Sequence, residues 1–179
     1  MVESLLSRMS LEEKIGQMVM VGFDGHSLTP ELEDHLNRYE VGNVIFFSRN
    51  IESNAQLAAF TRALQGMASR RNMPIGLLTA IDQEGGVVAR LLEGVSVFPG
   101  NMALGATCSA DYSRRASAVM AEEMLELGLN MNLAPVLDVN NNPDNPGIGV
   151  RSYGEDPELV TRMGVAAIEG SQSAGVMAT

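Results

Sequence analysis

The chain has 179 residues, of which 45% are hydrophobic, and a mean hydropathy of +0.05, which is typical of a globular protein rather than a disordered one. Its 22 acidic and 12 basic residues give a formal net charge of −10, which argues against nucleic acid or an anionic membrane as the main partner. The single cysteine, Cys108, excludes an intramolecular disulfide. The amino terminus lacks a secretory signal pattern, and no apolar segment is long enough to span a bilayer. We therefore expect a cytoplasmic protein without a membrane span.

The first part of the chain alternates helix and strand patterns. Ser10, followed three residues later by a glutamate, predicts a capping box and a short helix over residues 10–16. The apolar run at 18–21 then predicts a buried strand. Thr29, followed by a proline, begins a second helix. The apolar run at 44–47 predicts a second strand.

The alternation continues to the end of the sequence, with two long loops inserted. In chain order, the predicted elements are a helix from Asn54, a strand at 75–81, a glycine-rich loop from Asp82 to about Thr107, a helix capped by Ser109 or Asp111, a strand at 131–136, a loop at 140–155, a helix from Asp156 and a strand at 175–179. Strands that alternate with helices predict an α/β fold with a parallel sheet.

The strands are apolar throughout rather than alternating, as expected when helices cover both faces of the sheet. Two architectures fit this pattern. One is an open, doubly wound sheet, and the other is a portion of a (β/α)8 barrel, which typically needs about 250 residues. Periodicity does not separate them. Because the sequence shows neither a repeat nor a flexible linker, residues 1–179 are predicted to form one domain.

Polar side chains follow the predicted strands at their carboxyl ends, which is where parallel sheets bind ligands in both architectures. These residues are Asp24, Arg49, Asn50, Asp82 and Asp138. The two long loops lie on the same side. This edge of the sheet is therefore the predicted binding site.

The segment 82–90 carries the strongest chemical signal. Gly85 and Gly86 allow a tight turn and leave space for a ligand. The carboxylate of Asp82 can accept hydrogen bonds from sugar hydroxyls, and the guanidinium of Arg90 can donate to them. The other interpretation is a structural ion pair between the same two side chains. The segment has neither the P-loop pattern nor the dinucleotide-binding glycine pattern.

Arg151 lies in the second long loop, which three prolines are expected to stiffen, Pro143 and Pro146 within it and Pro157 just after it. It is either a second ligand-binding arginine or a loop arginine bonded to backbone carbonyls. His26 and His35 have no triad or metal partner in the sequence and are predicted to lie at the surface. Cys108 is predicted to be structural, and no residue spacing matches a metal site.

Five segments of this chain together resemble glycoside hydrolase family 3. They are residues 9–18, 42–50, 81–90 with Phe98 and Pro99, 133–139 and 145–157. The resemblance covers nearly the whole chain in order, and it is nearest to the bacterial β-N-acetylglucosaminidases of cell-wall recycling. It implies that the chain is the N-terminal portion, about half, of a (β/α)8 barrel.

The resemblance also implies a retaining hydrolysis of β-linked N-acetylglucosamine, with a covalent glycosyl intermediate and without a metal or organic cofactor. Asp82, Arg90 and Arg151 would hold the hydroxyls of the sugar. Asp138 would be a further contact or would support the loops. The carbohydrate substrate is thus the expected partner.

In the family, a substrate-binding Lys-His segment, a His-Asp acid/base pair and the nucleophilic aspartate come after the position of Thr179. We therefore expect no catalytic residue in this chain and no activity from it alone. Half a barrel also leaves edges unpaired, which predicts a homo-oligomer or a missing C-terminal half. The alternatives are a non-catalytic sugar-binding or assembly module, a β-glucosidase or β-xylosidase of the same family, and a doubly wound domain that binds another small molecule.

Overall fold

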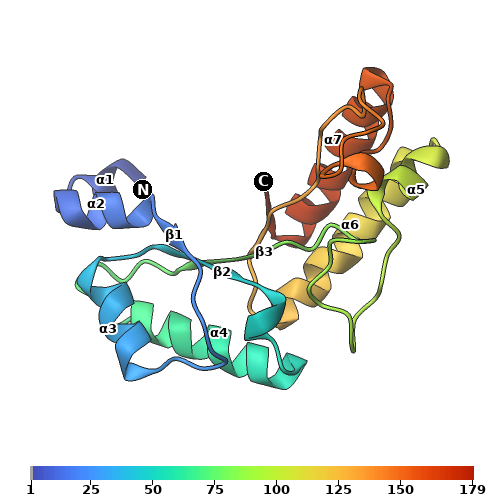
Figure 1. The fold of residues 1–179 in the computed structure, drawn as a ribbon. Coiled ribbons are helices and arrows are strands. Elements are labelled where there is room, and N and C mark those ends of the chain that lie inside the picture. The colour runs from blue at the N-terminus through green and yellow to red at the C-terminus, as the bar shows by residue number, and fades with distance from the viewer. Residues whose placement is uncertain (1) are drawn as a thin grey trace. The chain divides into compact units, whose positions relative to one another are not determined.

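The structure is a computed structural model that describes residues 2–179 (Figure 1). It contains two compact units, one that ends at Ala80 and one that spans Ile81–Thr179. Each unit is an assembly of short parallel strands and helices, so the predicted α/β class is confirmed. Whether the two units make a single domain stays a prediction. None of the helices in residues 2–179 combines the length and apolar character needed to cross a bilayer.

The first unit follows the predicted alternation of helices and strands. Its elements are α1 (Val2–Leu6), α2 (Leu11–Gln17), β1 (Met20–Val21), α3 (Pro30–Arg38), β2 (Asn43–Phe46), the 3-10 turn η1 (Ser48–Asn50), α4 (Asn54–Ala68) and β3 (Leu78–Ile81, whose last residue begins the second unit). The predicted capping box is confirmed, because Ser10 Oγ accepts from Glu13 N and the Glu13 carboxylate accepts from Ser10 N. The side chains of Thr29 and Ser53 cap α3 and α4 by accepting from the backbone N–H groups of Leu32 and Gln56.

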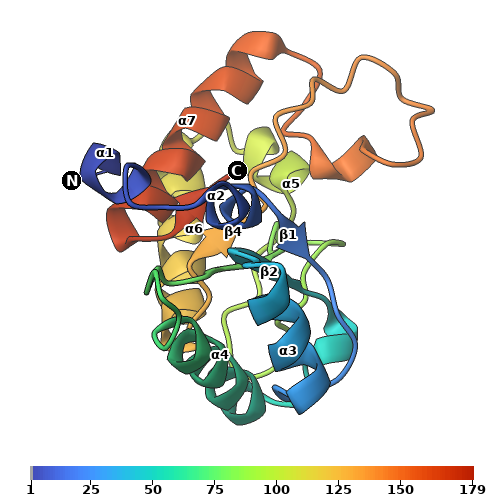
Figure 2. The same ribbon diagram turned by 90° about the vertical axis from the view of Figure 1, so that its left-hand side faces the viewer.

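The strands of the first unit lie in the order β1-β2-β3. Met20 is paired with Asn43 in a parallel register, and the backbone N–H of Leu78 donates to the carbonyl of Gly42. Helices α3 and α4 lie next to each other in both views (Figures 1 and 2). The predicted apolar stripe of α4 is buried at Leu57, Phe60, Leu64 and Met67. Helix burial of this kind is what makes a parallel sheet stable in water.

Beside this core, the first unit has an apolar groove of about 830 Å³. The residues that line it come from α2, β1 and α3 and the segments between them, among them Ile15, Val19, Leu32 and Tyr39. Ile15 and Tyr39 are each more than half exposed. An open groove with this lining is unusual on a soluble monomer.

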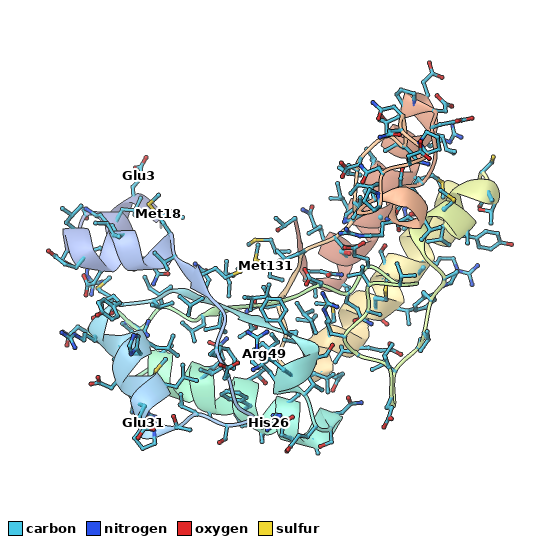
Figure 3. The ribbon with its side chains drawn as sticks, viewed as in Figure 1. Glu3, Met18, His26, Glu31, Arg49 and Met131 are labelled. Carbon is cyan, nitrogen blue, oxygen red and sulfur yellow. The ribbon has the colours of Figure 1, made fainter. Side chains whose placement is uncertain are left out.

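The first predicted strand is wrong in its start and in its burial. The predicted run began at Met18, but α2 continues to Gln17 and the backbone N–H of Met18 caps it by donating to the carbonyl of Ile15. Met18 is 85% exposed and is labelled in Figure 3, while Met20 and Val21 are half-buried. The apolar run therefore divides between a helix end and a two-residue strand.

The second unit contains the elements that carry the two long loops. They are α5 (Asn101–Ala106), α6 (Ala110–Glu126), β4 (Met131–Asn132), the 3-10 turn η2 (Gly149–Arg151), α7 (Pro157–Ala174) and β5 (Met177–Ala178). Helix α5 lies inside the segment that was predicted to be an irregular loop. Strand β4 is shorter than predicted, and Pro135 follows it at a position where it cannot donate to a ladder.

The strands of the second unit continue in chain order. The backbone N–H of Leu133 donates to the carbonyl of Ile81 at the end of β3, and Met131 is paired with Met177 in a parallel register. The order in this unit is therefore β3-β4-β5. Neither unit shows the reversal of strand order that defines a doubly wound sheet. The order is that of the N-terminal portion of a (β/α)8 barrel.

Helices α6 and α7 pack along each other and cover this part of the sheet (Figures 1 and 2). Ser113 in α6 donates to the carbonyl of Met163 in α7 and lies 3.0 Å from the hydroxyl of Tyr153, Oγ to Oη. Tyr153 is 2% exposed. Burial raises the pKa of the Tyr153 phenol, and the hydrogen bond with Ser113 opposes part of that rise. The end of the second long loop is thereby fixed to both helices.

Candidate functional site

Asp82 and Arg90 form an ion pair directly after β3. The Nη2 of Arg90 donates to Oδ2 of Asp82 at 2.9 Å. The side chain of Arg90 is 28% exposed and that of Asp82 is 21% exposed. The structural ion pair that the sequence suggested therefore exists, but both partners remain accessible to a ligand. The Nε of Arg90 is buried and has no hydrogen-bond partner within residues 2–179. A buried donor without a partner is rare in native proteins.

The side chain of Gln83 holds the loop between Asp82 and Arg90 through hydrogen bonds to its backbone, a role that was not predicted. Its Oε1 accepts from the backbone N–H groups of Arg90 (2.8 Å) and Leu91 (3.0 Å), and its Nε2 donates to the carbonyl of Leu91 (3.0 Å). The backbone of Gln83 also exchanges two hydrogen bonds with the side chain of Asn132 in β4. This loop is therefore held as tightly as a regular element, and it presents Asp82 and Arg90 in a fixed relation.

Gly85 and Gly86 are required because the backbone at 98–100 lies so close to them that it leaves no room for a side chain. Gly85 has φ +87, and a Cβ there would lie 2.9 Å from the carbonyl oxygen of Pro99. Gly86 has φ +61, and its Cβ would lie 2.7 Å from the Cα of Gly100. The predicted tight turn is confirmed, and the reason for it is that two backbone segments meet side by side.

Arg151 is held by Glu84, a residue to which the sequence had assigned no role. The Nε and Nη2 atoms of Arg151 donate to the two carboxylate oxygens of Glu84 at 2.9 and 2.6 Å, and its Nη1 donates to the carbonyl of Gly147 at 2.8 Å. The side chain of Glu84 is 4% exposed and that of Arg151 is 29% exposed. Such a two-point contact fixes the plane of the guanidinium.

The electrostatics of Arg151 show that further carboxylates are close to it. Hydrogen bonding to Glu84 is the main cause that raises the pKa of Arg151, while partial burial opposes the rise. The negative charges of Asp82 and Asp138 also raise this pKa. Both predicted aspartates therefore act on the same guanidinium. The structure brings Asp82, Arg90, Arg151 and Asp138 into one electrostatic cluster.

Asp138 differs from the other two carboxylates because its side chain is unpaired. The residue is exposed, and its carboxylate has neither a hydrogen bond nor an ion pair among the residues that the structure describes. Its backbone carbonyl accepts from the hydroxyl of Ser152, next to Arg151. Asp138 therefore both supports the loop through its backbone and offers a free carboxylate.

The loop before Arg151 is shaped by asparagine side chains in addition to its prolines. The Oδ1 of Asn145 accepts from the backbone N–H groups of Gly147 (2.9 Å) and Ile148 (3.3 Å). Asn101, at the start of α5, donates to the carbonyl of Arg151 at 2.9 Å. A polar residue that begins an unpredicted helix thus helps to place the arginine.

The strand-end residues of the first unit have partners of their own. Arg49 donates to Asp24 at 2.8 Å in an exposed pair, and its guanidinium lies over the ring of Phe47. Asn50 is buried and bonded to backbone carbonyls, which is a structural role. His26, labelled with Arg49 in Figure 3, lies at the surface 3.3 Å from Glu52, so the histidine has a carboxylate partner that the sequence did not reveal.

The remaining candidates give no sign of chemistry. His35 and Cys108 are exposed, and within residues 2–179 no group of three or more His, Cys, Asp or Glu side chains is placed to hold a metal ion. The cluster of the second unit therefore contains two guanidinium groups, two carboxylates paired with them and one free carboxylate. Paired carboxylates and guanidinium groups that stay accessible are suited to hold the hydroxyl groups of a polyol.

Comparison with known proteins gives a consistent result. Residues 10–179 match the sequence profile described as "Glycosyl hydrolase family 3 N terminal domain". The chain is 41% identical over 155 residues to beta-hexosaminidase A of Pseudoalteromonas piscicida, which covers 84% of the chain and 26% of that protein. It is 33% identical over 168 residues to a beta-hexosaminidase of Stenotrophomonas maltophilia, which covers 90% of the chain and 48% of that protein.

Solved structures are similar as well. A glycoside hydrolase family 3 beta-N-acetylglucosaminidase from Paenibacillus sp. str. FPU-7 superposes with a TM-score of 0.91 at 47% identity, over 95% of this chain and 32% of that one. A beta-N-acetylhexosaminidase from Beutenbergia cavernae superposes with a TM-score of 0.85 at 32% identity, over 95% of this chain and 52% of that one. The chain thus spans from about a quarter to about half the length of these relatives.

Proposed function

Because the chain belongs to glycosyl hydrolase family 3, we propose that its protein is a retaining exo-β-N-acetylhexosaminidase that acts on the β-linked N-acetylglucosamine of cell-wall glycans. The names of the relatives support this substrate class. The observation that carries the proposal is the cluster of Asp82, Arg90 and Arg151, whose charged groups are hydrogen-bonded to protein and still accessible.

We assign to these residues the binding and orientation of the sugar. Asp82 would accept hydrogen bonds from hydroxyl groups, and the unpartnered Nε of Arg90 is a further donor for the ligand or for a water that the ligand contacts. Asp138 is proposed as an additional contact or as a support of the loop. Binding that fixes the ring relative to the reacting groups lowers the barrier without chemistry at these residues.

The reacting carboxylates are proposed to lie elsewhere in the protein. A retaining glycosidase uses two carboxyl groups about 5–5.5 Å apart, one as nucleophile and one as acid and base. Asp82 and Glu84 each form an ion pair with an arginine of this chain, which suits a binding or structural role. The 179 residues alone are therefore expected to be inactive. The chemistry requires neither a metal nor an organic cofactor.

The proposal is tested with Asp82→Ala in the full natural polypeptide that carries this chain. Loss of a charged hydrogen-bond partner should lower kcat/KM on an aryl β-N-acetylglucosaminide by about 10- to 100-fold, or about 1.5–3 kcal/mol. Asp111→Ala removes an exposed aspartate that faces Arg115 on α6 and is the matched control. Unchanged kinetics in the Asp82 variant would remove this residue from the site.

Two alternatives make different predictions for the same protein. A β-glucosidase or β-xylosidase would prefer a sugar with a free 2-hydroxyl, so aryl β-glucoside and β-xyloside are measured beside the N-acetylglucosaminide. A non-catalytic sugar-binding module would bind N-acetylglucosamine without any turnover, which titration calorimetry distinguishes from hydrolysis.

We also propose a cytoplasmic protein in which the apolar groove of the first unit is covered, either by a second copy or by a C-terminal half of the barrel. Two chemical properties of the chain support this proposal. The single thiol is compatible with a reducing compartment, and the groove exposes apolar side chains that water solvates poorly.

A further inference from the structure

Two buried side-chain amides, those of Asn132 and Gln83, hold the main chain that carries the proposed sugar-binding ion pair. Strands β3 and β4 are joined by a main-chain hydrogen bond from the N–H of Leu133 to the carbonyl of Ile81. Beyond this bond the Asn132 side chain takes the place of a strand neighbour. Its Oδ1 accepts from the N–H of Gln83 at 3.0 Å, and its Nδ2 donates to the carbonyl of Gln83 at 2.8 Å. A primary amide can do this because it has a donor and an acceptor, as a peptide group has.

The amide of Gln83 extends this support to the other end of the segment. Its Oε1 accepts from the N–H groups of Arg90 and Leu91, and its Nε2 donates to the carbonyl of Leu91. Asp82 directly precedes Gln83 in the chain. The two amides therefore act in series, and they fix the main chain at both members of the ion pair.

Both amides are shielded from water, since Gln83 is 4% exposed and Asn132 is 3% exposed. Burial of an amide is unfavourable unless the group is hydrogen-bonded, and an apolar side chain of similar size would fill the same volume without that cost. The hydrogen bonds of these amides are directed at the main chain on either side of the ion pair. What the amides supply is therefore the geometry of the segment rather than the filling of the core.

We propose that Gln83 and Asn132 are positioning residues of the sugar site, which orient Asp82 and Arg90 without contacting the sugar. The inference rests on the proposed function, because it takes Asp82 and Arg90 to hold the hydroxyl groups. It extends the site to β4, which provides no group that reaches the ligand in this account.

The geometry of the ion pair is sensitive to small displacements. The Nη2 of Arg90 lies 2.9 Å from Oδ2 of Asp82, and hydrogen bonds weaken steeply when their geometry departs from the optimum. A displacement of about 1 Å at a binding group can lower the rate of an enzyme about 100-fold. Without the Gln83 amide, the main-chain N–H of Arg90 loses this partner, and the two binding groups can shift relative to each other.

Asn132→Leu in the full natural polypeptide tests the positioning role by a double-mutant cycle with Asp82→Ala. We expect kcat/KM on an aryl β-N-acetylglucosaminide to fall about tenfold when Asp82 is present and less than about threefold when it is already alanine, because residues that act through one another are not additive. Equal falls in the two backgrounds would show that Asn132 acts independently of the ion pair, and they overturn the proposal.

The matched control is Asn43→Leu, which changes another buried asparagine. Asn43 is 7% exposed, begins β2 at its N-terminal end and donates through Nδ2 to the carbonyls of Gln17 and Val19. Its loss should destabilise the fold by a comparable amount in urea titration and change kcat/KM less than about twofold. A fall of kcat/KM as large as that of Asn132→Leu would assign the effect to stability, which overturns the proposal.

Gln83→Met is the second variant, and it removes the other amide while keeping a long, unbranched side chain. It is carried through the same cycle with Asp82→Ala, so the test stands if Asn132→Leu does not fold. The same pattern is expected, with a fall in kcat/KM that largely disappears when Asp82 is alanine.

Hydrogen–deuterium exchange of residues 82–91, followed by mass spectrometry, measures the positioning without a substrate. Exchange should be about tenfold faster in Asn132→Leu and in Gln83→Met than in the unsubstituted protein, and unchanged in Asn43→Leu. Unchanged exchange in the first two variants would show that the amides do not fix the segment. If the unsubstituted protein hydrolyses no N-acetylglucosaminide, the proposed function fails, and the exchange rates alone then support or overturn the hold of the two amides on the segment.

Discussion

At the scale of single residues, the site depends on which arginine is held by which carboxylate. Asp82 was expected to contact a ligand or to form an ion pair, and the structure shows the ion pair with both side chains still accessible. Glu84 is the opposite case, because its carboxylate is almost completely buried. It fixes the guanidinium of Arg151, and its burial makes the fold depend on the pair.

Glu84→Gln should therefore destabilise the chain. The substitution keeps the shape and removes the charge opposite Arg151, and hydrogen bonds between charged groups contribute about 1.5–3 kcal/mol. Because Arg151 is partly exposed, we expect a loss of about 1–2 kcal/mol in the free energy of unfolding, measured by urea titration. Glu155→Gln changes an exposed glutamate of the loop that carries Arg151, and it should stay within about 0.5 kcal/mol. Equal stability of the two variants would contradict a structural role of the pair.

At the scale of elements, the packing of α6 on α7 depends on backbone contact. A Cβ at Gly170 in α7 would overlap the carbonyl of Arg114 in α6. In α4, by contrast, a Cβ at Gly66 would have its nearest neighbour, the Nη1 of Arg70, at 3.8 Å. Both glycines lie inside a helix, so the sequence alone does not distinguish them, but their neighbours in space differ.

Gly170→Ala should consequently lower the free energy of unfolding by about 2 kcal/mol, because the helices must separate. Gly66→Ala should raise it by about 0.5–1 kcal/mol, because alanine restricts the unfolded chain and favours a helix. Circular dichroism during denaturant titration measures both variants. A stabilised Gly170 variant would show that the helices can move apart without cost.

Tyr153 connects the second long loop to the same helix pair, and its titration should appear in alkaline stability. Its pKa is raised in the folded chain, so the neutral phenol stabilises the fold fully below the unfolded pKa of about 10. As pH rises from that value through the higher folded pKa, the folded state binds more protons than the unfolded state, and stability falls.

In Tyr153→Phe this fall above pH 10 should be smaller, while stability at pH 8 should drop by about 1 kcal/mol through loss of the Ser113 hydrogen bond. Urea titrations at pH 8 and pH 10.5 measure both effects. Tyr112→Phe, at an exposed position of α6, is the control. A parallel pH dependence of the Tyr153 variant and the unsubstituted chain would contradict this account.

At the scale of the whole molecule, the chain has the strand order of a barrel and spans at most about half of the relatives compared above. The apolar groove of the first unit is a surface at which association is expected. We expect the mass of the isolated 179-residue chain to rise with concentration in light scattering, because exposed apolar surface favours self-association. Ile15→Glu, in the groove, should reduce the effect, and Met18→Glu, exposed but outside the lining, should not. A monomer mass that does not change with concentration would contradict self-association through the groove.

The sequence by itself determined the alternation of helices and strands, the capping box at Ser10, the apolar stripe of α4 and the strand end at which Asp82 lies. These features depend on neighbours along the chain, so periodicity and cap residues are sufficient to predict them. Asp138 was predicted to follow a strand at 131–136, but β4 ends at Asn132. The family resemblance of the sequence motifs was confirmed by the match of residues 10–179 to the family profile.

Tertiary structure alone decided the strand order, the exposure of Met18 and the pairing of each charge. Glu84 and Arg151 are 67 residues apart, and Gln83 and Asn132 are 49 apart, so no local pattern joins them. The glycine pair could be recognised in the sequence, but the backbone that it accommodates could not. Which arginine neutralises which carboxylate, and which carboxylate remains free at Asp138, is fixed by three-dimensional proximity because electrostatic energy depends on distance in space and not along the chain.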